Sequence, residues 1–322
     1  MKLIIQIPCY NEEAILAETL AVLPKSISGF DCVELLVVDD GSEDKTVEVA
    51  EACGVDHIIR LQQHQGLGRA FINGLEACLR LGADVIVNTD ADNQYSAEDI
   101  PNLLQPILNG EADFVIGTRP IRSIDHFSWL KKCLQKLGSR VVRAASQTAV
   151  MDAPSGFRAI TRKAAMQLNV FSSYSYTLET LIQAGHAGIS TVSVPVRVNS
   201  KQRPSRLVSS LFSYVQKSAL TIIRTYAIYR PLEFFFGIAA LFFLPGLILS
   251  FRFLYYFLTG DGDGHVQSVI LSVFLMSAGF SLVVIAILAE LISVNRQLLE
   301  KIGYYQQLIE AKIDKGTDGF VD

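Results

Sequence analysis

The chain has 322 residues, of which 50% are hydrophobic and only 19% are charged. This composition excludes an intrinsically disordered chain, which combines low hydrophobicity with high net charge. Five cysteines in this length, none of them in a C-x-x-C pair, also exclude a disulfide scaffold and disfavour a Cys/His metal site. The length allows about two domains.

The net charge of −4 conceals three segments of different sign. Residues 1–118 hold 6 Lys and Arg against 20 Asp and Glu, residues 119–232 hold 17 against 3, and residues 233–322 hold 5 against 9. A basic middle segment predicts an anionic partner, which is a nucleic acid, an anionic lipid or a phosphorylated substrate. We expect no nucleic-acid partner, because the segment carries no motif for reading bases and runs directly into long apolar stretches.

The first part of the chain alternates apolar runs with helical patterns. The runs predict strands at residues 3–7, 33–38, 57–61, 84–88 and 113–117. A helix is predicted at residues 12–23, with Asn11 as its N-terminal cap, and another follows the 33–38 strand and ends at about residue 52. Further helices are predicted at residues 67–81 and 97–108. A helix at 128–146, strands at 156–161 and 191–198, and a helix at 177–184 follow. This alternation predicts a mostly parallel α/β sheet that binds ligands beyond the carboxyl ends of its strands.

Two apolar stretches follow the basic segment. Residues 234–258 contain one charge, Arg252, and residues 266–289 contain none. Each stretch reaches roughly 36 Å as a helix, which is enough to cross a ~30 Å hydrocarbon core. Lys and Arg flank the pair on its outer sides and are missing from the connecting loop, so both termini and the domain that precedes the pair are predicted to be cytoplasmic. We expect a two-span protein of the inner or plasma membrane.

Two further helical patterns accompany these spans. Residues 206–229 carry apolar side chains at helical spacing among basic ones, which is typical of interfacial helices on a lipid bilayer and also of an ordinary packed helix pair. Residues 295–313 show near-heptad spacing, which indicates a partner helix in a homo-oligomer or a surface helix with one apolar face.

Several polar motifs stand where strands are predicted to end. Asp39 and Asp40 follow the second strand, and a D-x-D motif, Asp90 and Asp92, follows the fourth. Mg²⁺ sites use one or two carboxylates together with substrate phosphates, so the D-x-D spacing fits a metal, although a capped turn would look similar. Arginines close the other motifs, and their planar forks suit phosphate oxygens: Gly117-Thr118-Arg119, Ser155-Gly156-Phe157-Arg158 and Arg203-Pro204-Ser205-Arg206-Leu207.

A glycine-rich segment at residues 66–71 approximates a dinucleotide fingerprint. Phe71 stands where the third Gly or Ala of that fingerprint belongs. We therefore reject a dehydrogenase.

These motifs, taken in order with Pro8-Cys9-Tyr10-Asn11-Glu12-Glu13, resemble the family 2 glycosyltransferases. The resemblance is to the polyprenyl-phosphate branch, which includes dolichol-phosphate mannose synthases and bacterial undecaprenyl-phosphate glycosyltransferases. It implies a GT-A fold with a Rossmann-like sheet, followed by two C-terminal transmembrane helices. The division it implies is residues 1–206 for the cytoplasmic GT-A domain, 207–230 for juxtamembrane amphipathic helices, 231–293 for the two spans and 294–322 for a cytoplasmic tail.

The resemblance also implies roles for individual residues. The nucleoside pocket is lined by Pro8, Tyr10, Glu12 and Asp39. The divalent ion, Mg²⁺ or Mn²⁺, and the diphosphate are held by Asp90, Asp92 and Gln94. The phosphates of donor and acceptor are met by Arg119, Arg203 and Arg206. Lys131 stands where relatives can have an arginine that binds the lipid phosphate, and Asp152 positions the acceptor or an arginine.

The reaction expected from this resemblance is inverting, metal-dependent transfer of a hexose from a nucleotide sugar to a polyprenyl phosphate. We favour UDP-glucose and undecaprenyl phosphate; the alternative is a mannose synthase that uses GDP-mannose. A processive polysaccharide synthase is disfavoured because the chain lacks a Q-x-x-R-W motif and has only two predicted spans. A non-catalytic scaffold that binds lipid or nucleotide sugar is disfavoured by the presence of Asp90, Asp92 and Arg119.

Overall fold

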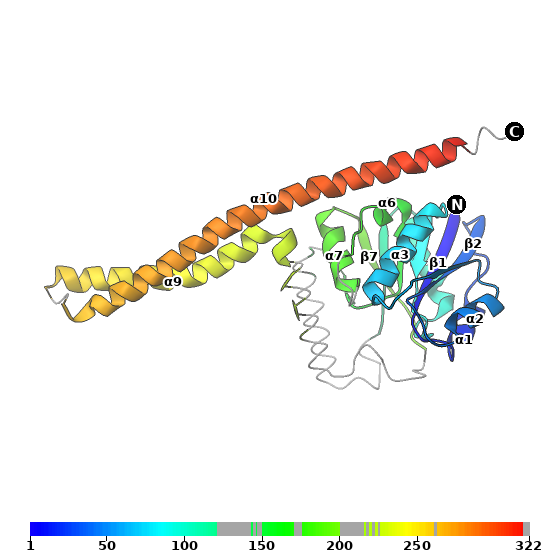
Figure 1. Cartoon of the computed structure of the whole chain (residues 1–322), viewed down its shortest axis with the longest axis horizontal. Coiled ribbons are helices and arrows are strands. Elements are labelled where there is room, and N and C mark those ends of the chain that lie inside the picture. Colours follow the sequence, from blue (N-terminus) through cyan, green and yellow to red (C-terminus); the bar gives the residue numbers. More distant parts are fainter. Residues whose placement is uncertain are drawn as a thin grey trace. The chain divides into compact units, whose positions relative to one another are not determined.

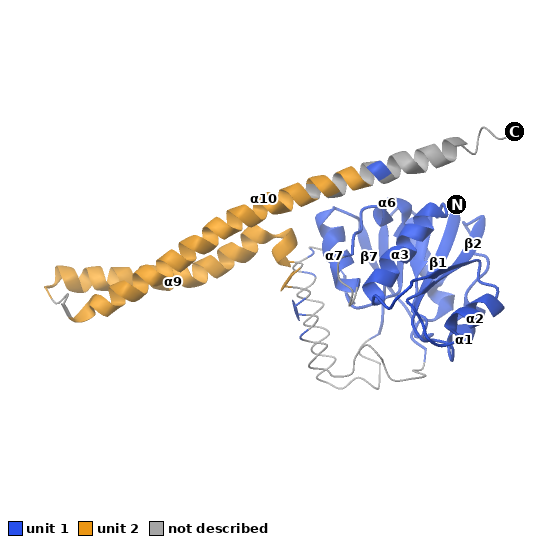
Figure 2. Cartoon of the chain, in the orientation of Figure 1, with its two compact units in different colours: residues 1–222, 304–322 blue, residues 223–303 orange. Residues whose placement is uncertain are grey.

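The computed structural model describes residues 1–120, 150–170, 176–199, 226–260 and 263–317, with isolated positions at 143, 146, 216, 219, 220, 223 and 224. The chain divides into two compact units (Figure 2). The first unit comprises residues 1–222 and 304–322, and the second comprises residues 223–303. The helix predicted at residues 128–146 lies almost entirely outside the described residues, as does most of the predicted interfacial stretch.

The described part of the first unit contains one seven-stranded sheet (Figure 1). Its strands are β1 (Lys2–Cys9), β2 (Cys32–Asp39), β3 (His57–Arg60), β4 (Val85–Asn88), β5 (Phe114–Thr118), β6 (Arg158–Thr161) and β7 (Thr191–Pro195). The strand order is β3-β2-β1-β4-β6-β5-β7. Strand β6 runs antiparallel to β4 and β5, and the other pairings are parallel. The predicted mostly parallel α/β sheet is thereby confirmed.

Helices connect and cover these strands. They are α1 (Leu16–Val22), α2 (Thr46–Ala52), α3 (Leu67–Arg80), the 3₁₀ turn η1 (Ala97–Asp99), α4 (Ile100–Leu108), α6 (Arg162–Ala165) and α7 (Thr177–His186). The prediction that Asn11 caps the first helix was wrong. Asn11 has a left-handed φ of 54° and its side-chain oxygen accepts a hydrogen bond from the backbone of Glu43 at 2.9 Å, so α1 begins only at Leu16.

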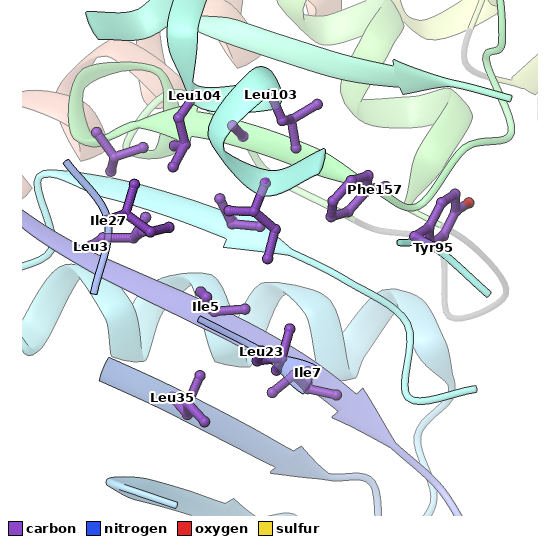
Figure 3. Close-up of a cluster of buried hydrophobic side chains, with 14 of the residues drawn as sticks. Leu3, Ile5, Ile7, Leu23, Ile27, Leu35, Tyr95, Leu103, Leu104 and Phe157 are labelled. Atoms are coloured by element: carbon purple, nitrogen blue, oxygen red, sulfur yellow. The ribbon is translucent and has the colours of Figure 1, made fainter. Parts of the chain in front are cut away.

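One face of the sheet is apolar because alternate residues of each strand point to it. Leu3, Ile5 and Ile7 of β1 are fully buried in a cluster with side chains of α1 and α4, including Leu103 and Leu104 (Figure 3). Burying a side chain of this size stabilises the fold by about 1.5–3 kcal/mol. This cluster makes the sheet rigid beneath the loops at its edge.

The opposite face carries a polar row. The register pairs Gln6 of β1 with Asn88 of β4, and Asn88 with Arg158 of β6, so three polar side chains lie side by side across three strands. All three residues are completely buried. Buried polar groups are stable only when they are hydrogen-bonded, and Gln6 Nε2 donates to Asn88 Oδ1 at 2.9 Å.

The second unit is a pair of long helices, α9 (Pro231–Leu258) and the first part of α10 (Val266–Thr317), joined through the short turn η3 (Asp263–His265). Residues 231–258 and 266–296 are long and apolar enough to cross a membrane. The two helices contact through small residues: Ser272 Oγ donates to the carbonyl of Gly246 at 2.8 Å, and a Cβ on Gly246 would lie 3.1 Å from Leu275. The helix predicted at residues 295–313 is not a separate element but the continuation of α10.

Candidate active site at the carboxyl edge of the sheet

The polar motifs meet at one edge of the sheet. Strands β1, β2, β4 and β5 are parallel and end there, and antiparallel β6 begins there. Ligands of open α/β sheets bind at this edge, where the connections diverge. The topology therefore brings together motifs that lie as much as 150 residues apart in the sequence.

The turn after β2 holds two buried carboxylates with different surroundings. Asp40 is fully engaged within the fold, since its oxygens accept hydrogen bonds from the backbone N–H groups of Gln65 and Gly66 at 2.8 Å and lie 2.9 Å from His64 Nδ1. Asp39 Oδ1 accepts from the backbone of Ser42 at 3.1 Å. Asp39 Oδ2 is buried and accepts no hydrogen bond from the described residues.

The turn after β1 lies beside the turn after β2. The backbone N–H groups of Asn11 and Glu12 donate to the hydroxyls of Ser42 and Thr46, at 2.9 and 2.8 Å. Pro8 is buried within β1, opposite Val38. The Tyr10 ring stacks on the His64 ring, with centroids 3.8 Å apart. The Tyr10 ring and Asp39 Oδ2, the buried oxygen that accepts no hydrogen bond from the described residues, thus lie at the ends of neighbouring strands. Arg60 Nε lies 3.7 Å from Asp39 Oδ2.

The D-x-D loop follows β4. Asp92 Oδ1 accepts from the backbone of Gln94 at 3.2 Å, and Thr19 Oγ1 of α1 donates to the carbonyl of Ala91 at 2.8 Å. No described residue donates a hydrogen bond to the Asp90 carboxylate. Burial and then the neighbouring Asp92 carboxylate raise the pKa of Asp90 to about 7. Two carboxylates crowded in this way need a positive charge to ionise together.

The loop before β6 closes over Asp90. A Cβ on Gly156 would lie 2.8 and 2.9 Å from the two oxygens of Asp90, so only glycine fits there without moving that carboxylate. The Gly156 N–H donates to Tyr95 Oη at 3.1 Å, and its carbonyl accepts from Asn88 Nδ2 at 2.8 Å and from Tyr176 Oη at 3.2 Å. The peptide groups on both sides of the Gly156 Cα are therefore held by buried side chains.

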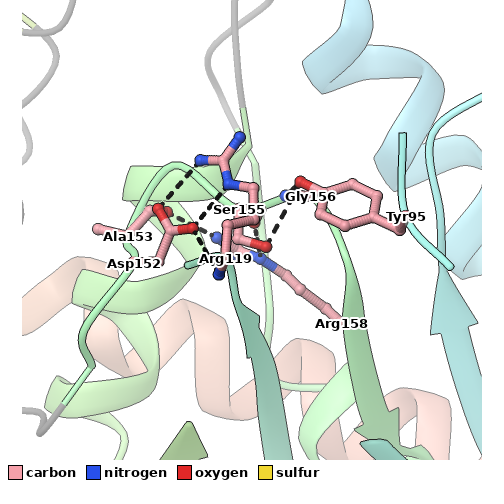
Figure 4. A network of polar contacts seen from close by, with 7 residues as sticks. All are labelled: Tyr95, Arg119, Asp152, Ala153, Ser155, Gly156 and Arg158. Carbon is pink, nitrogen blue, oxygen red and sulfur yellow. Dashed lines mark hydrogen bonds and ion pairs between the residues drawn. The ribbon is translucent and has the colours of Figure 1, made fainter. Parts of the chain in front are cut away.

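Arg119 and Asp152 form a buried ion pair at the end of β5 (Figure 4). Arg119 Nε and Nη2 donate to the two oxygens of Asp152 at 2.7 and 3.0 Å, and the Arg119 backbone N–H donates at 3.2 Å. The two side chains are 9% and 0% exposed. This geometry leaves Arg119 Nη1 without a hydrogen bond to any described residue.

The arginine of the Ser155-to-Arg158 motif does not face a ligand, contrary to the idea that its fork meets phosphate. Arg158 is completely buried and donates to the carbonyls of Ser155, Ala153 and Thr177 and to Thr180 Oγ1. Burial lowers its pKa to about 10, so it stays charged at neutral pH. Arg158 fixes the loop that carries Gly156.

The remaining predicted residues divide into two sets. Gln94 is half-buried behind Asp92, and its carbonyl accepts from the backbone of Asn199 at 2.9 Å. Lys131, Arg203 and Arg206 lie outside the described residues. Among the described residues, no group of three or more His, Cys, Asp or Glu side chains surrounds a metal position.

Sequence reasoning missed Tyr95, Tyr176 and Asn88. The available signal was polarity within apolar strands, since a glutamine, an asparagine and an arginine interrupt β1, β4 and β6. Buried amides and guanidinium groups require partners, so these positions predict a polar network on one face of the sheet.

Comparison with known proteins identifies the relatives of this chain. The sequence profile of glycosyl transferase family 2 matches residues 4–168. A UDP-N-acetylglucosamine–dolichyl-phosphate N-acetylglucosaminyltransferase from Methanococcus voltae is 29% identical over 216 residues, which cover 59% of this chain and 83% of the relative. A polyprenol monophosphomannose synthase from Mycolicibacterium smegmatis is 28% identical, covering 61% and 77%. An undecaprenyl-phosphate mannosyltransferase from Micrococcus luteus is 30% identical, covering 61% and 83%.

Solved structures with the same fold are also known. Glucosyl-3-phosphoglycerate synthase from Mycobacterium tuberculosis, crystallised with Mn²⁺, UDP-glucose and phosphoglyceric acid, superposes with a TM-score of 0.56 at 21% identity, covering 70% of this chain and 80% of that one. The predicted GT-A fold class and the family resemblance are both confirmed. Because the family profile spans slightly more than half of its 322 residues, this chain belongs to glycosyl transferase family 2 and is a glycosyltransferase.

Proposed function

We propose that the enzyme transfers a hexose from a nucleotide sugar to a polyprenyl phosphate at the cytoplasmic face of a membrane, with inversion at the anomeric carbon. The observation that carries this proposal is the half-buried Asp90 carboxylate, which lies near Asp92 and accepts no hydrogen bond from the described residues. Asp90 lies at the same edge of the sheet as Asp39 Oδ2 and the Arg119–Asp152 ion pair. The named acceptors of the relatives from Methanococcus, Mycolicibacterium and Micrococcus support the lipid phosphate.

A divalent cation fits the D-x-D loop. Desolvation and then the Asp92 charge raise the pKa of Asp90, and a cation would stabilise both carboxylates in their ionised form. Hard cations such as Mg²⁺ and Mn²⁺ prefer oxygen ligands. Asp92 and Asp90 would hold the ion with the diphosphate and water, and Gln94 lies next in the loop. The ion supplies neutralisation of the charge that develops on the leaving diphosphate.

The chain's own residues orient the donor. Asp39 Oδ2 offers a buried acceptor to a nucleoside N–H or O–H, and the stacked Tyr10 offers a ring surface next to it. Pro8 near the end of β1 and Glu12 in the turn that follows complete the nucleoside pocket in this proposal. Arg119 is held by Asp152 so that Nη1 reaches a donor phosphate without conformational search.

The nucleophile is an oxygen of the lipid phosphate. Phosphate monoesters have a second pKa near 6, so at pH 7 the group is largely a dianion and needs no strong base. Its oxygen forms a bond to the anomeric carbon while the bond from that carbon to the diphosphate oxygen breaks, and the nucleoside diphosphate leaves with the electron pair. The difficulty is repulsion between two anions, which we assign to Arg119 and, from the basic segment, to Lys131, Arg203 and Arg206.

The membrane arrangement follows from the same proposal. Helix α9 and residues 266–296 of α10 are assigned as spans, with the catalytic domain and both termini in the cytoplasm. The juxtamembrane stretch at 207–230 would hold the active site near the lipid headgroups. A homo-oligomer through the C-terminal part of α10 stays a prediction.

The donor is the least constrained part. We favour UDP-glucose, and a UDP sugar is supported by the Methanococcus relative, whose name gives a UDP-linked donor. A GDP-mannose enzyme is the second candidate, because two of the relatives are mannose transferases by name.

The test is a donor screen with purified full-length protein in detergent, undecaprenyl phosphate and either Mg²⁺ or Mn²⁺. Radiolabelled UDP-glucose, UDP-N-acetylglucosamine and GDP-mannose are offered in turn, and sugar in the organic-soluble lipid is counted. We expect one donor to give lipid-linked sugar that depends on the metal. Lipid-independent release of sugar from every donor would contradict the assigned acceptor.

A further inference from the structure

Both backbone hydrogen-bonding groups of Gly156, its N–H and its carbonyl, are engaged by side chains. Tyr95 Oη accepts its N–H, while Asn88 Nδ2 and Tyr176 Oη donate to its carbonyl. Tyr176 and Asn88 are completely buried, and Tyr95 is 4% exposed. None of these three side chains belongs to a motif that names a catalytic role, yet together they hold the two peptide groups on either side of the Gly156 Cα.

The Asp90 carboxylate lies close to Gly156. Its two oxygens lie 2.8 and 2.9 Å from the position of a Cβ on Gly156, and Tyr176 Oη lies 2.9 Å from the same point. The backbone of Gly156 is not left-handed, so an added methyl group would meet side-chain atoms and not backbone strain. The position of the Asp90 carboxylate therefore depends on how closely the Gly156 backbone approaches it.

The Tyr176 side chain is held in place by contacts of its ring and by a further hydrogen bond to its hydroxyl. Its ring stacks on Phe71 with centroids 3.9 Å apart and planes 3° from parallel, and the guanidinium carbon of Arg158 lies 5.4 Å from its centroid. Asn88 Nδ2 also donates to Tyr176 Oη at 2.7 Å, and Asn88 Oδ1 accepts from Gln6. The polar row of the sheet therefore ends at the Gly156 carbonyl.

We propose that Tyr176 is a positioning residue. Together with Asn88 and Tyr95 it holds the Gly156 backbone close to Asp90, and so fixes that carboxylate for the divalent cation and the donor diphosphate. This inference rests on the proposed function of Asp90 as a metal ligand. Groups that orient a metal ligand from behind change metal affinity by about 10–100-fold when they are removed.

The test measures Mn²⁺ binding directly and needs no turnover. Full-length protein in detergent is titrated with Mn²⁺ in the presence of UDP, and of GDP in a parallel series, while EPR follows the free ion. Tyr176→Phe removes one oxygen and keeps the ring stack, and it is expected to weaken Mn²⁺ binding about tenfold. Gly156→Ala is expected to weaken it about 100-fold, since its methyl group would lie 2.8 and 2.9 Å from the two Asp90 oxygens and displace them.

Thr161→Val is the matched control. Thr161 lies at the far end of β6, where its hydroxyl accepts from the backbone of Ala164 at 3.2 Å and donates to Asp113 at 3.1 Å. Its loss costs stability without touching the Gly156 peptide, so Mn²⁺ binding should stay within twofold of wild type. If Tyr176→Phe does not fold, Tyr95→Phe tests the same glycine through its N–H and should weaken binding by at least threefold.

The double variant Gly156→Ala/Tyr176→Phe gives the sharpest result. Because both changes act through the position of Asp90, the double variant should bind Mn²⁺ no more weakly than Gly156→Ala alone. Additive losses, wild-type affinity in Tyr176→Phe, an equal loss in Thr161→Val, or a wild-type protein that binds no Mn²⁺ with either nucleotide would each overturn the inference. If wild type binds Mn²⁺ with nucleotide and the variants weaken it as expected, but no sugar reaches polyprenyl phosphate, the proposed function fails and the inference stands.

Discussion

The substitution Asp152→Asn isolates the buried ion pair at the end of β5. It removes one charge and keeps the shape, so that Arg119, whose side chain is 9% exposed, is left as a buried cation facing an amide. Three hydrogen bonds from Arg119 to Asp152, at 2.7, 3.0 and 3.2 Å, are lost or weakened. Breaking a buried pair in this way costs about 3–5 kcal/mol, because the remaining charge has no compensation.

For a domain of this size each kcal/mol lowers the unfolding temperature by ~2–4 °C, so we expect a fall of roughly 10 °C. Thermal unfolding of the full-length protein in detergent measures it. Glu98→Gln is the control, because Glu98 pairs with Arg197 at 2.9 Å but is 78% exposed, and surface pairs contribute about 0–1 kcal/mol. Adding Arg119→Met to Asp152→Asn should restore much of the stability but not sugar transfer. An unfolding temperature unchanged by Asp152→Asn would refute the reasoning.

Three further predictions follow from the same structure. Asp92→Asn should lower kcat/KM by about 100-fold or more even at saturating Mn²⁺, which steady-state kinetics will show; near-wild-type turnover would remove Asp92 from the metal site. Asp39→Asn should raise the donor KM roughly tenfold with little change in kcat, because the buried acceptor oxygen is altered; an unchanged donor KM would speak against a nucleoside at Asp39. Burial would raise the pKa of Asp99, but hydrogen bonds from Arg197 outweigh it and lower that pKa. The stabilisation is therefore present above the unfolded-state pKa of about 4 and is lost as the pH falls below it, and Asp99→Asn should flatten the acid limb of unfolding temperature against pH.

The strand pattern of the sheet was predictable because it depends on local hydrophobicity. The predicted runs at 33–38 and 113–117 match the observed strands β2 (Cys32–Asp39) and β5 (Phe114–Thr118) to within one residue at each end. The direction of β6 was not predictable, since nothing local to residues 158–161 tells whether a strand runs parallel or antiparallel to its neighbours. The start of α1 was missed because a left-handed Asn11 depends on the adjoining turn after β2.

The candidate site was predictable where chemistry is concentrated in short motifs. The two carboxylates of the D-x-D loop and the acidic end of β2 can be read from spacing alone. The different partners of Arg119 and Arg158 cannot, because both guanidinium groups are buried and only the fold decides that Arg119 pairs with Asp152 while Arg158 donates to backbone carbonyls. Tyr176 reaches the site from the position just before α7, 86 residues beyond Asp90, a long-range contact with no local signal in the sequence.

The central claim is that a divalent ion and the donor diphosphate bind at the carboxyl edge of β4. A structure of the full-length protein with Mn²⁺ and the nucleoside diphosphate that supports transfer, with the ion located by its anomalous scattering, tests it most directly. The account predicts an anomalous peak within ligand distance of Asp90, Asp92 and the diphosphate, with the nucleoside lying toward Asp39 and Tyr10. An ion bound away from the D-x-D loop, or a nucleotide seated on another edge of the sheet, would contradict it.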